Sequence, residues 1–226
     1  QLGVTEDNES RNHHIVIQGT QGQVSFTACN CHTVIFLFHS FLLKSSVPIK
    51  TRDGCIQRMP HRVLLAQGHT VYGVARSYTA EFKELETAYA GRLFFKSIDL
   101  ASSGNVRETV FKEFITNKVQ LDGFVNNAAM AYDDIITNLN LERLEEMYAV
   151  NVFTPMMLTK YAIRHMLLHK NKGSIVHISS ISAHTGYKGL AMYASSKGAL
   201  EAFSKNTARE WGALGIRSNV VVPGFM

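Results

Sequence analysis

Two hydrophobic patterns alternate along most of this chain. Short runs in which apolar residues alternate or are continuous, typical of strands, cover 14–18, 69–75, 92–98, 121–125, 173–179 and 216–222. Segments with the apolar spacing or the composition of helices cover 78–90, 105–118, 141–169 and 192–214. Strands that alternate with helices of this length form βαβ crossovers. The pattern therefore predicts an α/β fold with a parallel sheet and helices on both of its faces.

Polar residues and turn-forming residues follow the predicted strands. The residues at these strand ends are Arg76, Asp99, Asn126, Ser180 and the pair Pro223-Gly224. In open α/β sheets, ligands bind beyond the carboxyl ends of the strands. The sequence therefore predicts that one ligand site runs along this edge of the sheet.

A serine, a tyrosine and a lysine form the clearest chemical motif. Ser180 closes an apolar run, Tyr193 follows thirteen residues later, and Lys197 comes four residues after that. Side chains four residues apart emerge on one face of a helix. An ammonium beside a phenol favours the phenolate, and working near neutrality requires the pKa of about 10 to fall by roughly three units, or about 4 kcal/mol. We expect Lys197 and a cationic cofactor ring to supply this shift, while Ser180 holds a carbonyl oxygen to which Tyr193 passes a proton.

This motif stands in a fixed order with five other pieces of sequence. The pieces are 68–76, Asp99-Leu100, 126–129, Asn151-Val152, the set Ser180, Tyr193 and Lys197, and 219–226. A lone Tyr-x-x-x-Lys is weak evidence, whereas six pieces with matching spacing are specific. From about residue 64 to 226 the chain resembles the short-chain dehydrogenase/reductases, and most closely their 3-oxoacyl-[acyl-carrier-protein] reductase-like branch.

The resemblance implies a Rossmann-type doubly wound parallel sheet in a single domain, and a role for each matching residue. Tyr193 would be the general acid/base, and Lys197 would lower its pKa and bind the nicotinamide ribose. Ser180 would position the substrate oxygen. Asn151 would complete the catalytic set by holding a water in a proton relay to Lys197. Taken alone, these residues also have ordinary interpretations as exposed helix positions, a strand-end hydroxyl and a cap at a helix kink.

The implied cofactor is NADP rather than NAD. Arg76 stands where an acid would hold the ribose 2′-hydroxyl of NAD, and an arginine there suits a 2′-phosphate. Asn127 would lie next to the adenosine ribose, and Asp99 would touch the adenine. The other expected cofactor contacts are Gly19, Gly22, Tyr193, Lys197, Pro223, Gly224 and Met226. The alternatives are a solvated strand-end charge for Arg76 and a helix N-cap for Asp99.

The chain departs from the family pattern at both ends. The family opens with a strand, a glycine-rich turn and a helix, but here Gly19 and Gly22 lie far upstream of Gly68, and Gly54 lacks partner glycines. We therefore interpret about 24–57 as an insertion foreign to the fold within one domain of 1–226; the alternative is a genuine but degenerate nucleotide-binding half. At the other end the family continues beyond Met226, so we expect a truncated C-terminus without the final edge strand and substrate lid.

Bulk properties exclude several other classes. The chain has 226 residues, of which 46% are hydrophobic and 18% charged, as in a globular domain. The net charge of +5 is scattered, so we expect no nucleic-acid partner. Three cysteines favour a reducing, cytoplasmic setting, and Cys29-Asn-Cys31-His32 has no second ligand pair, so no metal site is expected. The apolar run 33–43 is too short to span a membrane.

The sequence thus predicts an NADP-dependent oxidoreductase that moves a hydride between nicotinamide and a carbonyl or secondary alcohol. The branch implies a ketone or alcohol substrate such as a 3-oxoacyl thioester, and hence fatty acid metabolism, by analogy only. Family members form homodimers or homotetramers through the long helices that contain Asn151 and Tyr193, so a homo-oligomer is implied. The alternatives are a non-catalytic or degenerate protein that acts as a binding module, and a nucleotide sensor.

Overall fold

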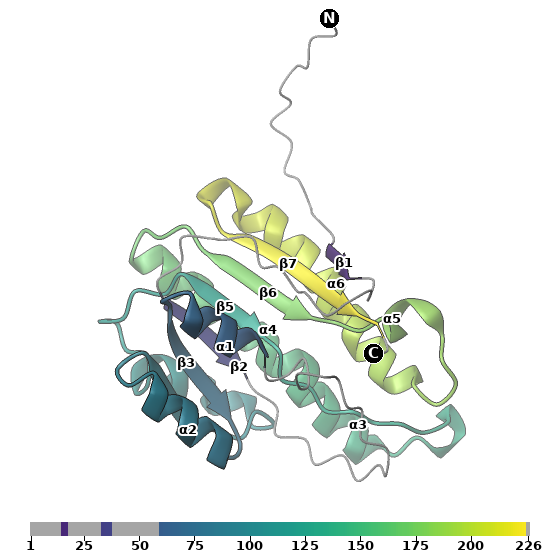
Figure 1. Cartoon of the computed structure of the whole chain (residues 1–226). Coiled ribbons are helices and arrows are strands. Elements are labelled where there is room, and N and C mark those ends of the chain that lie inside the picture. The colour runs from purple at the N-terminus through teal and green to yellow at the C-terminus, as the bar shows by residue number, and fades with distance from the viewer. Residues whose placement is uncertain (1–14, 18–32, 38–58, 225–226) are drawn as a thin grey trace, which may run out of the picture.

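Seven parallel strands form one sheet in the computed structural model, which describes residues 15–17, 33–37 and 59–224. The strand order is β1-β7-β6-β5-β2-β3-β4 (Figure 1). The strands are β1 (Ile15–Ile17), β2 (Thr33–Leu37), β3 (Thr70–Ala75), β4 (Leu93–Ser97), β5 (Gly123–Asn126), β6 (Ser174–Ile178) and β7 (Arg217–Pro223). The predicted α/β architecture with a parallel sheet is confirmed.

Helices cover both faces of this sheet. They are α1 (Met59–Ala66), α2 (Ala80–Ala88), α3 (Leu141–Tyr148), α4 (Thr154–Leu168), α5 (Ser182–Thr185) and α6 (Ala191–Trp211). Short 3-10 or π segments are η1 (Ser103–Asn105), η2 (Arg107–Lys112), η3 (Ile136–Asn138), η4 (Ala149–Phe153) and η5 (Gly212–Leu214). None of the described helices is long and apolar enough to cross a membrane.

Strand alternation divides the core between the two faces. On β5, Phe124 packs with residues of η2 and α4, whereas its neighbour Val125 packs with residues of α1 and α2. On β3, Val74 belongs to the first cluster and Val71 to the second. Because successive side chains of a strand point to opposite faces, each strand contributes to both cores. This two-sided burial explains the nearly continuous apolar runs of the central strands.

The predicted long helix over 141–169 is interrupted. A π segment, η4, joins α3 to α4, and Pro155 lies in the first turn of α4, where a missing backbone N–H is tolerated. The predicted helix over 105–118 is likewise replaced by η1 and the π segment η2.

The interpretation of 24–57 as a segment foreign to the fold is wrong for residues 33–37. They form β2, which lies between β3 and β5 near the middle of the sheet. Gly19 and Gly22 favour the segment 14–18 as the opening strand instead. The run Thr-Val-Ile-Phe-Leu of β2 is rich in the β-branched and aromatic residues that suit a central parallel strand.

Strand β1 instead occupies the edge of the sheet. It pairs in parallel with β7, with Ile15 opposite Val221, and is drawn beside β7 in Figure 1. Residues Ile15–Ile17 thus lie next to β7, at the edge where no strand was expected. Gly19, Gly22, Cys29, Cys31 and Met226 lie outside the described residues.

Candidate active site

The carboxyl ends of the parallel strands meet along one edge of the sheet. Paired residues near these ends are Ala75 and Ser97, Leu37 and Val74, Leu37 and Asn126, Asn126 and His177, and Ile178 and Val221. The predicted site residues that follow these strands are Arg76, Asp99, Asn127, Ser180 and Gly224. These residues therefore lie along this edge of the sheet, with Asn126 and Pro223 as the last residues of β5 and β7, whereas the chemical role of each stays a prediction.

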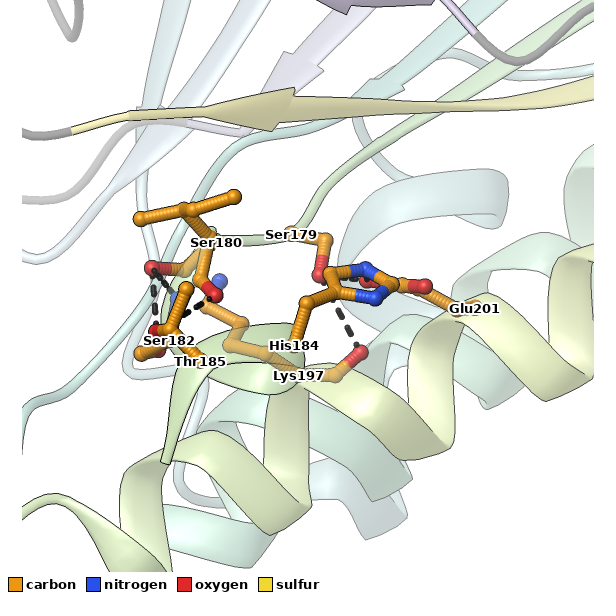
Figure 2. Close-up of polar contacts among 8 residues, drawn as sticks. Ser179, Ser180, Ser182, His184, Thr185, Lys197 and Glu201 are labelled. Carbon is orange, nitrogen blue, oxygen red and sulfur yellow. Dashed lines mark hydrogen bonds and ion pairs between the residues drawn. The ribbon is translucent and has the colours of Figure 1, made fainter. Parts of the chain in front are cut away.

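Ser180 lies in a short connection between β6 and α5. The backbone N–H groups of Ser179 and Ile181 donate to the carbonyl oxygens of Val221 (2.8 Å) and Pro223 (2.9 Å), so the connection stays attached to β7. The Ser180 Oγ accepts hydrogen bonds from the Ser182 N (3.2 Å) and the Ser182 Oγ (2.9 Å) (Figure 2). Since Ser182 supplies the proton between the two hydroxyls, the proton of Ser180 is directed to another acceptor, as binding of a substrate oxygen requires.

Lys197 lies on α6 and is buried, with 2% of the residue exposed. Its Nζ donates to the carbonyl oxygen of Ile178 (2.8 Å) and lies 5.6 Å from the centroid of the Tyr193 ring. Burial lowers the pKa of Lys197 to about 8. A protonated ammonium carries three donors, so two remain for a ligand once Ile178 has taken one. This geometry fits the predicted binding of ribose hydroxyls.

Tyr193 lies one turn before Lys197 on α6 and is half-buried against Tyr132, Met147 and Met192. Burial, followed by the negative charge of Asp133, raises the pKa of Tyr193 to about 12. The protein groups by themselves therefore do not lower this pKa, because the Tyr193 hydroxyl is desolvated, while the Lys197 Nζ is hydrogen-bonded to Ile178. The lowering expected from Lys197 together with a cationic cofactor ring stays a prediction. Tyr193 is held as a protonated phenol, which is the form that donates a proton.

Asn151 lies on the π segment η4 and is fully buried. Its Oδ1 accepts from the Met130 N (2.7 Å), and its Nδ2 donates to the Met130 O (2.9 Å) and the Ser196 Oγ (2.9 Å). Both amide protons are thus used within the protein, and the side chain braces the segment after β5 against α6. The predicted role of Asn151 in holding a water stays a prediction. Such a water would bond to the remaining lone pair of the Asn151 Oδ1.

Arg76 and Asp99 follow the neighbouring strands β3 and β4, and both are exposed. The Ser97 Oγ donates to the Arg76 O (2.7 Å), which fixes the backbone at this point. The Asp99 Oδ1 accepts from the Ala101 N (3.0 Å). This contact supports the alternative interpretation of Asp99 as a local turn or cap residue.

The edge also presents polar atoms that suit a nucleotide. Asn127 is 4% exposed, and its Nδ2 has no hydrogen-bond partner within the described part of the chain. A buried donor left unpaired costs about 1–3 kcal/mol, which a ligand oxygen would recover. At the end of β7, Gly224 is exposed, and a Cβ there would meet nothing within 4 Å. Together with Lys197 and the exposed Arg76, these residues fit a nicotinamide dinucleotide.

Three residues of the site were not predicted from the sequence. Glu201 bonds to Ser179 beside Ser180, Ser182 donates to Ser180, and Asp133 raises the pKa of Tyr193. Only Glu201 carried a signal, because it lies four residues after Lys197 and hence on the same side of a helix. The described residues contain no group of three or more His, Cys, Asp or Glu side chains that could hold a metal ion.

The family model for short chain dehydrogenases matches residues 56–226. Among curated relatives, the 3-oxoacyl-[acyl-carrier-protein] reductase FabG of Chlamydia pneumoniae is 31% identical over 62% of this chain and 56% of its own length. Carbonyl reductase family member 4 of Xenopus tropicalis is 33% identical over 65% of this chain and 61% of its own. The NADPH-dependent aldehyde reductase 1, chloroplastic, of Arabidopsis thaliana is 32% identical over 63% and 48% respectively.

The matched regions therefore span about half to three fifths of the length of these relatives. Among solved structures, a short-chain dehydrogenase from Streptomyces avermitilis is 25% identical, with a TM-score of 0.69 over 88% of this chain and 65% of that one. Strand β2 precedes the region that the family model matches, although it lies within the sheet.

Proposed function

The chain belongs to the short-chain dehydrogenase family, and we propose that it is an NADP-dependent oxidoreductase that interconverts a carbonyl compound and its alcohol. One observation carries this proposal. The Lys197 Nζ binds the carbonyl oxygen of Ile178, so α6, which carries Tyr193, is joined to the strand end that leads into Ser180. This contact supports a joint role of Ser180, Tyr193 and Lys197 in one site.

The chemistry of the chain follows from these contacts. The Ser180 hydroxyl, whose oxygen already accepts from Ser182, donates its proton in a hydrogen bond to the carbonyl oxygen of the substrate. Tyr193, which is a neutral phenol at pH 7, gives its proton to the same oxygen as negative charge develops there. The bound nicotinamide supplies the hydride in reduction and accepts it in oxidation. Lys197 orients the ribose and stabilises the phenolate that Tyr193 becomes.

The protonation state of Tyr193 is the one from which carbonyl reduction starts. With a pKa near 12 almost no phenolate is present at neutral pH, so alcohol oxidation needs a cationic partner that lowers this pKa. In reduction the proton is already in place. The neighbouring Lys197, with its pKa near 8, is the group that returns a proton to the phenolate.

The preference for NADP is supported by Arg76. Its side chain is exposed just beyond β3, next to β4, and its backbone is held by Ser97. A guanidinium at this place suits a 2′-phosphate, with which it forms charge-assisted, bidentate hydrogen bonds. The similar aldehyde reductase of Arabidopsis thaliana is described as NADPH-dependent, which agrees with this choice.

For the substrate we propose a ketone, with a 3-oxoacyl thioester as the first compound to test. The names of the FabG and carbonyl reductase relatives support this class. We further propose a homodimer or homotetramer that forms through α3, α4 and α6. The exposed Phe153 at the end of η4, with 52% of the residue accessible, provides an apolar contact for such an interface.

The test is a titration of the purified chain with NADPH, with NADH in parallel, followed by turnover of acetoacetyl thioesters and simple ketones. We expect NADPH to bind more tightly than NADH, and Tyr193→Phe to bind NADPH unchanged while turnover falls at least 100-fold. Binding without turnover of any ketone would favour the nucleotide-sensing alternative. Absence of binding by either nucleotide would contradict the proposed function.

A further inference from the structure

A buried carboxylate lies behind the candidate catalytic serine. Glu201 is on α6, one turn beyond Lys197, and its side chain is 10% exposed. Burying a carboxylate is unfavourable unless hydrogen bonds compensate. Within the described residues Glu201 forms no ion pair with Lys197, whose Nζ is directed to Ile178 instead. An ion pair with Lys197 therefore does not explain why Glu201 is buried at this position.

The contacts of Glu201 converge on the segment that carries Ser180. Its Oε1 accepts a 2.6 Å hydrogen bond from the Ser179 Oγ and lies 3.0 Å from the His184 Nε2 (Figure 2). Ser179 directly precedes Ser180, and His184 lies on α5, one turn after it. One carboxylate oxygen thus holds both flanks of the serine against α6.

The helix α5, which carries His184, is itself hydrogen-bonded to Ser180. Ser182, on the same short helix as His184, donates to the Ser180 Oγ from both its N and its Oγ. The His184 N donates to the Ile181 O (2.9 Å), which makes the segment a compact turn. A displacement of α5 away from Glu201 would therefore move the donors that orient the Ser180 hydroxyl.

We propose that Glu201 is a positioning residue for Ser180, an inference that rests on the proposed function. By holding Ser179 and His184 to the helix that carries Tyr193 and Lys197, it fixes the Ser180 hydroxyl relative to the other two groups. Glu201 would act through Ser179 and His184 and not through contact with substrate or cofactor. Misplacement of a reacting group by about 1 Å can cost on the order of 100-fold in rate, so a residue behind the site can govern turnover.

Removal of Glu201 should leave the fold intact. The Ser179 Oγ also lies 3.4 Å from the Lys197 O, so it has a second acceptor when the carboxylate is absent. The His184 side chain is 51% exposed and can turn to solvent. The effect of the substitution should therefore appear in catalysis rather than in folding.

The decisive experiment is a double-mutant cycle between Glu201→Ala and Ser180→Ala, measured as kcat and KM for the ketone with NADPH saturating. We expect Glu201→Ala to lower kcat about 10- to 50-fold with the NADPH dissociation constant within about threefold of the parent. In the Ser180→Ala background the same change should lower kcat less than threefold, because there is no serine left to position. Glu201→Gln keeps an oxygen acceptor for Ser179 and should restore most of the activity.

Glu210→Gln is the matched control, because Glu210 is exposed near the end of the same helix. It should leave kcat and KM unchanged. Equal losses from Glu201→Ala with and without Ser180 would overturn the proposal, and so would full activity of Glu201→Ala.

A second measurement keeps the two proposals apart. If the parent chain binds no nucleotide or turns over no ketone, the proposed function fails, and amide hydrogen exchange then decides about Glu201. Glu201→Ala should raise exchange at Ser182 and His184 at least 10-fold, whereas Glu201→Gln and Glu210→Gln should not. Unchanged exchange at these amides would contradict the positioning role.

Discussion

The Nζ of Lys197 donates a 2.8 Å hydrogen bond to the carbonyl oxygen of Ile178, the last residue of β6. This bond links the middle of the candidate site to the sheet, because Ile178 is two residues before Ser180 and Lys197 is four residues after Tyr193. It also places an ammonium group in a buried position, which lowers the pKa of Lys197 from 10.5 to about 8. Function and stability therefore conflict at Lys197.

Lys197→Met should abolish turnover while stabilising the fold. The lowered pKa corresponds to about 3 kcal/mol of unfavourable burial at pH 7, and losing the charged hydrogen bond to Ile178 offsets about 2 kcal/mol of that gain. We expect the free energy of unfolding at pH 7 to rise by about 1 kcal/mol, measured by urea denaturation.

The pH dependence of the same variant gives a second readout. Between pH 8 and 10.5 the unfolded parent holds a proton that the folded parent has lost, so parental stability rises with pH in this window. Lys197→Met should lack this rise. Lys205→Met, at an exposed position of the same helix, should retain the rise. A lower free energy of unfolding for Lys197→Met than for the parent at pH 7 would contradict the unfavourable burial of Lys197.

Asn151→Ala should destabilise the chain by about 2–4 kcal/mol. The substitution leaves the backbone N and O of Met130 without their partner, and these two part-buried groups cost about 1–2 kcal/mol each, within the range of about 1–3 kcal/mol for a buried unpaired group. The Ser196 hydroxyl loses one donor but keeps its bond to the Tyr193 O. Asn206→Ala removes an exposed asparagine whose side chain, within the described residues, bonds to the backbone of its own helix alone, and should cost less than about 1 kcal/mol. Equal effects of the two changes in urea denaturation would show that Asn151 is no brace.

Strand alternation, helix spacing and the motif around Tyr193 predicted most of the fold and the edge that holds the site. The prediction of the opening strand failed, because it depended on the positions of glycines. The strand before Gly19 is β1, at the edge of the sheet, whereas the apolar run of β2 lies between β3 and β5. Which of two apolar segments pairs with β3 and β5 depends on contacts between distant strands, and local patterns do not report them.

The charge states of the site were also beyond sequence reasoning. Spacing placed Lys197 beside Tyr193 and suggested a lowered phenol pKa, but spacing does not report desolvation. Burial and Asp133 dominate at Tyr193, and the ammonium finds its acceptor at Ile178. The role of Glu201 depends on Ser179 and His184, which come near α6 only in the folded chain.

Arg76→Asp should reverse the nucleotide preference. Loss of charge-assisted hydrogen bonds to a 2′-phosphate is worth about 1.5–3 kcal/mol, so the NADPH dissociation constant should rise about 10- to 100-fold. The new carboxylate suits a ribose 2′-hydroxyl, so NADH should bind at least as well as before. Fluorescence titration measures both constants. Arg209→Asp, which makes the same charge change at an exposed position of α6, is the control; an equal loss there would point to net charge alone.

Acid should destabilise the fold through His177. This histidine is fully buried on β6, where the ring of Phe203 meets it edge-on and its Nδ1 lies 3.4 Å from the Asn126 Nδ2. Burial, followed by the positive charge of Lys197, lowers the pKa of His177 from 6.5 to about 4. Between these values the unfolded chain binds a proton that the folded chain rejects, so stability falls as pH drops from 6.5 to 4, by about 3 kcal/mol in all.

His177→Gln should remove this part of the acid sensitivity, because glutamine does not titrate. Urea denaturation at pH 7.5, 6.5, 5.5 and about 4.5 measures it as the difference between variant and parent, which cancels the carboxylates that titrate in both. The difference should change by about 2 kcal/mol or more across the series, in favour of the variant at low pH. His69→Gln, at a less buried histidine, should follow the parent. A constant difference between His177→Gln and the parent would mean that His177 is protonated in the folded chain as readily as in the unfolded one.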